Sequence, residues 1–230
     1  ADPSEIVFTS CGSESNNTAI FGSVETMGQS AKVITSRVEH PAVLGPCRKL
    51  RDQGHNVVEL KVNSGGLLDM ADMAREVSNR LVFASIMWAN NETGVIFPVA
   101  EAARLIKQAG GVFHTDAVQA VGKVPIDVQK VPVDLMSFSG HKIHAPKGIG
   151  VLYVRKGTKI NPYLLGGHQE NGRRGGTENV PYIVALGKAC ELAMASMDEE
   201  ATRMAKLRDR LEAGLLKTCP DSMVNGDRKN

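Results

Sequence analysis

Residues 81–114 read LVFASIMWANNETGVIFPVAEAARLIKQAGGVFH, and this stretch decides the fold class. The run from 81 to 88 is almost continuously apolar, as expected of a β-strand that is covered on both faces. A helical pattern follows from 98 to 108, beginning at a proline and ending at Gly110-Gly111, and a second strand covers 111–114. Strand, helix and strand in this order predict an α/β layer fold with a mostly parallel sheet.

The same alternation extends in both directions from this unit. Short runs rich in β-branched residues predict further strands at 6–8, 32–35, 57–62, 134–138 and 150–154. Helical patterns occupy 14–27, 42–53 and 68–79. In such sheets ligands bind beyond the carboxyl ends of the strands, so residues that directly follow a strand are the candidates for chemistry.

The last part of the chain differs, because no strand signal appears from 178 to 217. Apolar residues recur there every three or four positions: Met197, Ala201, Met204, Leu207, Leu211 and Leu215. This stripe predicts one long amphipathic helix. Packing on a domain is favoured over binding of a partner, and the helix would suit a connection to a second domain that this chain does not contain.

Composition excludes several classes of protein. Of 230 residues, 42% are hydrophobic and 23% charged, and the net charge is +2. With 4% aromatic residues and no basic surplus, neither nucleic-acid nor anionic-membrane binding is indicated. No run of eighteen apolar residues exists, so no membrane span is expected. No secretory signal is expected, and the scattered Cys11, Cys47, Cys190 and Cys219 are expected to be small buried residues in a reduced, cytoplasmic setting.

Polar residues follow several of the predicted strands where packing alone would not select them. The segment 9–15 leads from a strand into a helix and could bind a phosphate, although a capped helix start explains Ser13 and Ser15 equally well. The segment 90–94 is either a turn or a ligand contact. Asp116, between a strand and a helix, is either an N-cap or a carboxylate for a positively charged ligand nitrogen.

Lys142 follows another apolar strand, beside Gly140 and His141. A lysine in apolar surroundings is rare unless it is paired or functional, and desolvation makes its amine nucleophilic; the alternative is a surface lysine in a loop. A phosphate cradle, a carboxylate for a pyridinium nitrogen and an imine-forming lysine are together what pyridoxal phosphate requires. No third ligand accompanies His141 and His144 at metal-binding spacing, so no metal site is expected.

These motifs resemble those of class V aminotransferase-fold enzymes, and more narrowly the cysteine desulfurases of the nitrogen-fixation (NifS-like) type. The matching segments are EHPAVL at 39–44, NNETG at 90–94, HTDAVQ at 114–119, SGHK at 139–142, APKGIG at 145–150, GGHQE at 166–170 and RRGGTEN at 173–179. The resemblance covers essentially the whole chain, in order. It implies the large domain of a type I pyridoxal-phosphate-dependent transferase, with a mostly parallel, mixed seven-stranded sheet and helices on both faces.

The resemblance also implies domain limits and residue roles. Residues 1–195 would be the large domain without its N-terminal segment, and 196–230 a connecting helix and the start of a small C-terminal domain. Lys142 would form the Schiff base with the cofactor, Asp116 would pair with its ring nitrogen, and His40 would stack on the ring and move protons. Asn91 and Gln119 would lie near the ring hydroxyl, Asn91 also near the substrate carboxylate. The remaining cofactor-binding residues, mainly for the phosphate, would be Gly12, Ser13, Ser139, Gly140, His141 and, from a partner subunit, Thr177.

The implied activity is removal of sulfur from L-cysteine, which gives L-alanine and an enzyme-bound persulfide. A cytoplasmic homodimer would pass this sulfur to an iron–sulfur scaffold protein, for nitrogenase assembly. None of the four cysteines matches the family's catalytic cysteine, so we expect that residue outside this chain. A selenocysteine lyase and a catalytically silent scaffold of the same fold stay open, whereas the absence of GxGxxG after the first strand disfavours a nicotinamide-dependent enzyme.

Overall fold

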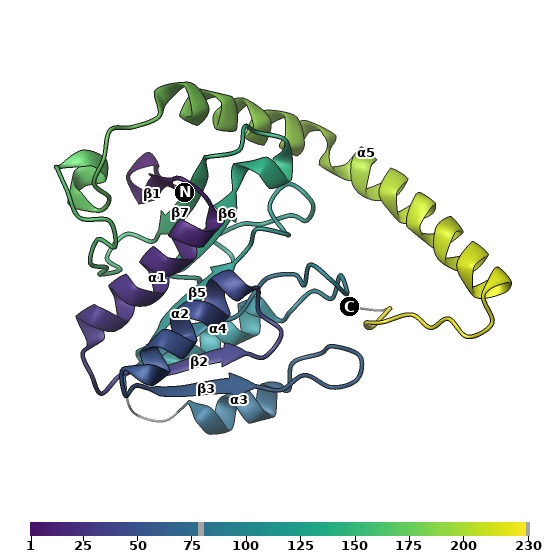
Figure 1. The fold of residues 1–230 in the computed structure, drawn as a ribbon, viewed down its shortest axis with the longest axis horizontal. Helices are drawn as coiled ribbons and strands as arrows, with labels where there is room; N and C mark the ends of the chain where they lie inside the picture. The colour runs from purple at the N-terminus through teal and green to yellow at the C-terminus, as the bar shows by residue number, and fades with distance from the viewer. Residues whose placement is uncertain (78–80, 229–230) are drawn as a thin grey trace.

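The computed structural model describes residues 1–77 and 81–228, and within them the strands form one seven-stranded sheet (Figure 1). The strands are β1 (Ile6–Thr9), β2 (Lys32–Ser36), β3 (Asn56–Leu60), β4 (Val82–Ser85), β5 (Val112–Asp116), β6 (Leu135–Ser139) and β7 (Gly150–Val154). Their order across the sheet is β1-β7-β6-β5-β4-β2-β3. β7 runs antiparallel to β1 and β6, and the other neighbouring pairs are parallel. The predicted mixed, mostly parallel sheet is confirmed.

Helices cover both faces of this sheet, as predicted. They are α1 (Gly12–Met27), α2 (Pro41–Asp52), α3 (Met70–Glu76), α4 (Val99–Gln108) and α5 (Val180–Thr218), with short 3-10 helices η1 (Pro3–Glu5), η2 (Gly140–Ile143) and η3 (Gln169–Gly172). Successive side chains of a strand point to opposite faces. Phe83 therefore packs in the cluster under α1 and α2, and Ala84 in the cluster under α3 and α4. The helix predicted at 68–79 is shorter, and its positions 78 and 79 lie outside the described residues.

The strand predicted at 81–88 is in the right place, but regular pairing with β2 stops at Thr35 and Ser85. The chain beyond Ser85 stays extended along β5, because the Ile86 amide donates to the His114 carbonyl (3.2 Å) and the Trp88 amide to the Asp116 carbonyl (2.8 Å). This extension carries Met87 and Asn91 to the sheet edge where β5 and β6 end.

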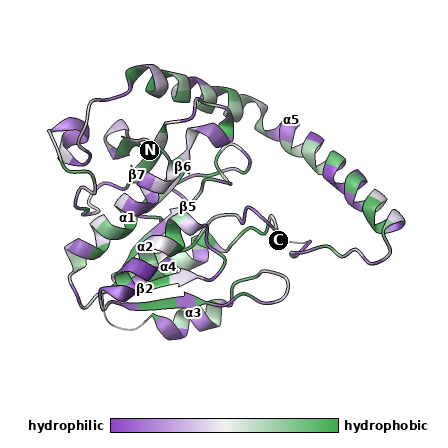
Figure 2. Ribbon diagram, viewed as in Figure 1, coloured by the Kyte–Doolittle hydropathy of each residue, from purple (hydrophilic) through white to green (hydrophobic). Residues whose placement is uncertain are grey.

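The long helix α5 packs on the sheet domain only along its first half (Figure 1). Leu186 and Ala189 are buried there in a cluster that includes Ile143 of η2. Leu207 and Leu211, further along, are 50% and 64% exposed, and Figure 2 shows apolar and polar residues alternating on this outer part. The helix is continuous across the domain limit expected at 195/196.

One stretch of α5 meets the length and composition of a membrane-crossing helix, although the sequence contains no unbroken run of eighteen apolar residues. An 18-residue window of α5 has a mean hydropathy of 1.2, and 11% of it is buried. One helix of this kind is weak evidence for a span, since length and composition alone decide the test. Leu186 and Ala189 place this part of α5 against the domain.

Candidate functional site

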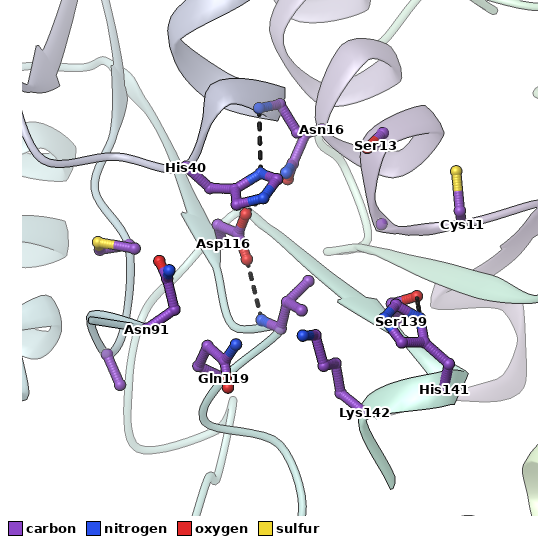
Figure 3. Close-up of a pocket in the computed structure, with 15 residues that line it drawn as sticks. Cys11, Ser13, Asn16, His40, Asn91, Asp116, Gln119, Ser139, His141 and Lys142 are labelled. Carbon is purple, nitrogen blue, oxygen red and sulfur yellow. Dashed lines mark hydrogen bonds between the residues drawn. The ribbon is translucent and has the colours of Figure 1, made fainter. Parts of the chain in front are cut away.

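A cavity of about 310 Å3 lies at the edge of the sheet where β4, β5 and β6 end, beside the first turns of α1 and α2. A cavity of this size can hold a cofactor of small-molecule dimensions. Nine of the predicted site residues line it: Gly12, Ser13, His40, Asn91, Asp116, Gln119, Ser139, His141 and Lys142. Figure 3 labels all of these except Gly12 and shows that the labelled side chains reach the same hollow from separate elements of the fold.

Asp116, the last residue of β5, lies at the bottom of this hollow and is 6% exposed. One carboxylate oxygen accepts a hydrogen bond from the Val118 amide (2.9 Å) and the other from Asn16 Nδ2 (2.7 Å). Burial raises the pKa of Asp116, while these two bonds and the nearby His40 oppose the rise. The carboxylate is thus held in one orientation, and a positively charged group in the cavity would stabilise its ionised form.

Asn16 is a cavity residue that the sequence motifs did not indicate. It lines the cavity from α1, it is fully buried, and its Oδ1 has no hydrogen-bond partner among the described residues. It contacts Asp116 across 100 positions of sequence. The available signal was a polar side chain inside an otherwise buried helix, and polar residues in such places are normally hydrogen-bonded.

The N-terminus of α1 forms one wall of the cavity and is open toward it. Its N-cap is Cys11, which makes no side-chain capping bond. The Ser15 hydroxyl is hydrogen-bonded to the Thr9 hydroxyl (2.7 Å). Neither Ser13 nor Ser15 therefore caps this helix, and the capping explanation does not hold. A Cβ on Gly12 would lie 2.9 Å from Val118 Cγ2 and 3.3 Å from Ser139 Cβ. Glycine there lets the helix end approach the cavity, and free amides at a helix N-terminus attract an anion.

Ser139 and His141 stand opposite this helix end. The Ser139 hydroxyl is hydrogen-bonded to His141 Nδ1 (2.8 Å). Burial, and then the charges of Lys142 and Lys147, lower the pKa of His141. The pair offers hydroxyl and imidazole groups to the same anion that the helix end would bind.

His40 enters the hollow from the loop before α2, and Lys142 enters it from η2 (Figure 3). His40 is the N-cap of α2, and its Nδ1 accepts a hydrogen bond from the Ala42 amide (3.1 Å). The neutral ring therefore carries its hydrogen on Nε2. Lys142 lies in η2 and is exposed, which corrects the expectation of apolar surroundings. A second cation, Lys123, is near, since burial and the charge of Lys142 lower the pKa of Lys123.

The loop after β4 is both a turn and a cavity wall. Asn90 is buried and builds the turn, because its Oδ1 accepts hydrogen bonds from the amides of Glu92 and Thr93 (both 2.9 Å). Its neighbour Asn91 is exposed and lines the cavity. Across the hollow, Gln119 Oε1 accepts from Lys123 Nζ (2.8 Å), which leaves the Gln119 amide hydrogens available.

Two of the predicted site residues do not line the cavity. Gly140 packs underneath, where a Cβ would lie 2.8 Å from Ile149 Cγ2 and 3.1 Å from Leu186 Cδ1. Thr177 lines a separate hollow of about 160 Å3, next to Arg174, whose guanidinium is paired with Glu14 at the beginning of α1. In the described part of the chain, no group of three or more His, Cys, Asp or Glu side chains could hold a metal ion.

The expectation of four buried cysteines holds for Cys47 alone. Burial raises the pKa of Cys47 to about 12. Cys11 and Cys190 are half-buried, and Cys219, directly after α5, is exposed. Cys11 is the cysteine that lines the cavity.

In this fold a lysine, a buried aspartate and an open helix end meet around one cavity. The pattern of the aminotransferase class-V family matches residues 1–230, and the chain belongs to that family. It is 51% identical over 227 residues to the cysteine desulfurase of Nostoc sp. and 52% identical to the cysteine desulfurase NifS of Azotobacter vinelandii. Both matches cover 99% of this chain but only 57% and 56% of the relatives, so the chain spans little more than half of their length.

Solved structures agree with this assignment. A NifS-like protein superposes with a TM-score of 0.91 at 42% identity, over 94% of this chain and 60% of its own. DndA from Streptomyces lividans gives a TM-score of 0.93 at 38% identity, over 100% of this chain and 66% of its own. The expected family and fold are therefore confirmed.

Proposed function

We propose that the whole protein is a pyridoxal-phosphate-dependent cysteine desulfurase, which converts L-cysteine to L-alanine and leaves the sulfur as a persulfide on the enzyme. The observation that carries this proposal is the convergence of Lys142, Asp116 and His40 on one cavity. A reactive amine, a buried carboxylate and an imidazole are the groups that this cofactor chemistry needs. The names of the relatives supply the substrate.

The residues present fit the cofactor. The unpartnered helix end and the absence of a side chain at Gly12 make room for a phosphate beside Ser13, Ser139 and His141. Asp116, at the opposite end of the hollow, is buried and forms no salt bridge within the described residues, and a protonated ring nitrogen would supply the positive charge for one. Gly140 would pack beneath the segment 139–142, against Ile149 and Leu186, and would not touch the cofactor.

The chain's own residues would divide the chemistry as follows. When bound, pyridoxal phosphate withdraws electrons from the α-carbon of an attached amino acid. Lys142 Nζ would anchor the cofactor and, once the substrate amine has displaced it, accept the proton from the substrate α-carbon. Asp116 would keep the ring nitrogen protonated, and His40 would stack on the ring with its Nε2–H available for proton transfer. Asn91 and Gln119 would bind the ring hydroxyl, and Asn91 also the substrate carboxylate.

The proposed protein extends beyond the described chain. We propose that residues 1–195 act as the cofactor-binding domain and that 196–230 lead into a small domain which carries the persulfide-forming cysteine. The exposed apolar residues of the outer part of α5 would be covered by that domain. Thr177 lies outside the cavity of its own chain. In a homodimer it would reach the phosphate of the cofactor that is bound in the other subunit. The sulfur acceptor would be an iron–sulfur scaffold protein in the cytoplasm, serving nitrogenase assembly.

The test uses the full-length protein with L-cysteine and a thiol reductant, and measures alanine and sulfide. We expect equimolar products and a yellow absorbance band from the bound cofactor. Lys142→Ala should abolish both the band and turnover after washing, whereas Lys147→Ala, five positions away, should abolish neither. Borohydride should trap the cofactor on a peptide containing Lys142. Turnover with selenocysteine but not cysteine would indicate a selenocysteine lyase, and no turnover with either would indicate a silent scaffold.

A further inference from the structure

Glu39 is a buried carboxyl group that the proposed chemistry does not use. It lies between the end of β2 and the beginning of α2, directly before His40, and it is 4% exposed. Burying an acidic side chain is costly unless the group is neutral or paired. Within the described structure Glu39 forms no salt bridge, so its place in the core needs an explanation.

The contacts of Glu39 join two elements that carry cavity residues. Its Oε1 accepts a hydrogen bond from the Ser36 hydroxyl (2.7 Å) and another from the Met87 backbone amide (2.9 Å). Ser36 ends β2, and Met87 lies on the extension of β4 that lines the cavity. A second bond, from Asn90 Nδ2 to the Val38 carbonyl (3.1 Å), ties the same loop to the same extension.

The Met87 amide would otherwise have no partner. The amides of Ile86 and Trp88, on either side, donate to carbonyls of β5. The Met87 amide points away from β5, toward the position that β2 would occupy if it continued, because alternate residues of a strand bond to opposite neighbours. Since β2 ends at Ser36, the Glu39 side chain takes the place of the missing strand carbonyl.

The charge state of Glu39 follows from its surroundings. Burial raises its pKa to about 8, the bonds from Met87 and Ser36 oppose the rise, and the negative charge of Asp116 on β5 adds to it. The other titratable groups about it are Cys47 on α2, whose own pKa the charge of Glu39 raises, and the adjacent His40. At neutral pH Glu39 is therefore protonated, and above about pH 8 it becomes a buried anion whose Oε2 has no hydrogen-bond partner in the described structure.

We propose that Glu39 is a positioning residue: in its neutral form it ties the loop that carries His40 to the end of β4, and so holds the His40 ring at the cavity. This inference rests on the proposed function only in giving the His40 ring a cofactor to stack on. The tie itself is a property of the chain. A solvent-exposed carboxyl ionises near its ordinary pKa of 4.5, whereas the buried Glu39 ionises only near pH 8, so the anchored loop conformation should lose stability as the pH rises from about 4.5 to about 8 and change little above that.

The experiment compares the full-length holoenzyme with Glu39→Gln, Glu39→Leu and the control Glu101→Leu, which changes an exposed glutamate of α4. Hydrogen exchange, corrected for the intrinsic rate at each pH, reports the protection of the segments 36–42 and 86–88. Loss of one buried hydrogen-bond acceptor should lower protection in Glu39→Leu by about tenfold or more, while β6 and β7 stay unchanged. In the wild type, protection of the same segments should fall between about pH 5 and pH 8, the range in which the buried and the exposed carboxyl differ in protonation. Glutamine keeps the acceptor and cannot ionise, so Glu39→Gln should retain protection at both pH values.

Turnover gives the second measurement. Glu39→Leu should lower kcat more than it raises KM, and it should shift the cofactor absorbance band. Glu39→Gln should have the kcat and the absorbance band of the wild type at pH 7. If Glu39→Leu does not fold, the comparison of wild type with Glu39→Gln across pH still decides. If the segments 36–42 and 86–88 had the same protection in the wild type and in Glu39→Gln at every pH, the proposal would be overturned. A wild-type protein that does not desulfurate cysteine would refute the proposed function, while the exchange data would still test the tie.

Discussion

The carboxylate of Asp116 receives its two hydrogen bonds from a backbone amide and from Asn16, and no cation is paired with it in the described structure. Burial favours its neutral form, whereas a protonated ring nitrogen in the cavity would favour the ionised form. Cofactor binding should therefore lower the pKa of Asp116. The charge pair would matter most when electrons move into the ring, which places its effect on the transition state rather than on binding.

Asp116→Ala in the full-length protein should accordingly lower kcat by about a hundredfold or more, the usual loss when one preorganised electrostatic partner is removed. Cofactor retention should change much less, since the lysine and the phosphate contacts remain. Turnover and the absorbance remaining after dialysis measure the two effects. The control is Asp127→Ala, an exposed aspartate whose loss should leave both unchanged. An Asp116→Ala enzyme with normal kcat would contradict the role.

Most cavity residues could be predicted from the sequence because they lie in short motifs directly after strands. Asp116 and Lys142 are examples, as both stand where an apolar run ends. Asn16 could not be found in this way, because its purpose is a contact with a residue 100 positions away. The side-chain tie made by Glu39 was hidden for the same reason, since it depends on where β2 ends relative to β4.

At the scale of elements, strands and helices lie close to where their patterns placed them, and the differences occur at ends that depend on a neighbour. β4 stops at Ser85 because β2, its partner, stops at Ser36. Apolar residues continue to Trp88, which is why the sequence predicted a longer strand. Periodicity reports burial, and burial continues past the point where backbone pairing is lost.

Gly150 opens β7 where the backbone of Cys11, between β1 and α1, comes very close. A Cβ there would lie 2.5 Å from the Cys11 carbonyl carbon, which is backbone and cannot move aside. Gly150→Ala should therefore lower the free energy of unfolding by about 2 kcal/mol, the usual cost of overpacking, and lower Tm by roughly 4–8 °C for a domain of this size. Thermal unfolding followed by circular dichroism measures this change.

The matched control is Gly187→Ala on the exposed face of α5, where an added Cβ meets nothing within 4 Å. Alanine is favoured over glycine inside a helix, so this variant should be more stable by about 0.5–1 kcal/mol. Opposite signs for the two glycines are expected. A neutral Gly150→Ala would show that the Cys11 backbone can move away from β7 without cost.

The outer part of α5 gives a second prediction at this scale. If a further domain covers Leu207 and Leu211, their replacement by aspartate should destabilise the full-length protein by about 2 kcal/mol or more. In the 230-residue chain the same exposed positions should change stability by no more than about 0.5 kcal/mol. Lys206→Asp serves as the control in both lengths. Equal effects in the two lengths would mean that this part of the helix is not covered.

At the scale of the whole molecule, the sheet order joins strands that are far apart in the chain. β1 pairs with β7, and the open end of α1 thereby comes to stand beside the ends of β5 and β6. The sequence alone predicted the class of sheet but not this order, because pairing of distant strands leaves no local pattern. The resemblance to a family implied seven strands and a mixed sheet, but the order of the strands came only from the structure.

The division of the active site between this chain and the rest of the protein can be tested directly. The proposed cofactor contacts all lie within residues 1–230, except for the Thr177 that a second copy would supply. The 230-residue chain should therefore bind pyridoxal phosphate weakly, and more tightly at concentrations where it dimerises. Absorbance titration beside analytical ultracentrifugation measures both quantities. It should release no sulfide from L-cysteine, because the proposed persulfide-forming cysteine is absent.

The environments of the four cysteines in this chain support the expectation that it releases no sulfide. Burial raises the pKa of Cys47 to about 12 and also raises that of Cys190, so neither supplies a thiolate at neutral pH. Cys219 is exposed on the outer end of α5, and Cys11 alone lines the cavity, at the end where the phosphate would bind. A sulfide assay on the 230-residue chain, with the full-length protein alongside, should therefore read zero for the wild type and for Cys11→Ala. Sulfide from the wild type that Cys11→Ala abolishes would make Cys11 the nucleophile, and the division proposed here would be wrong.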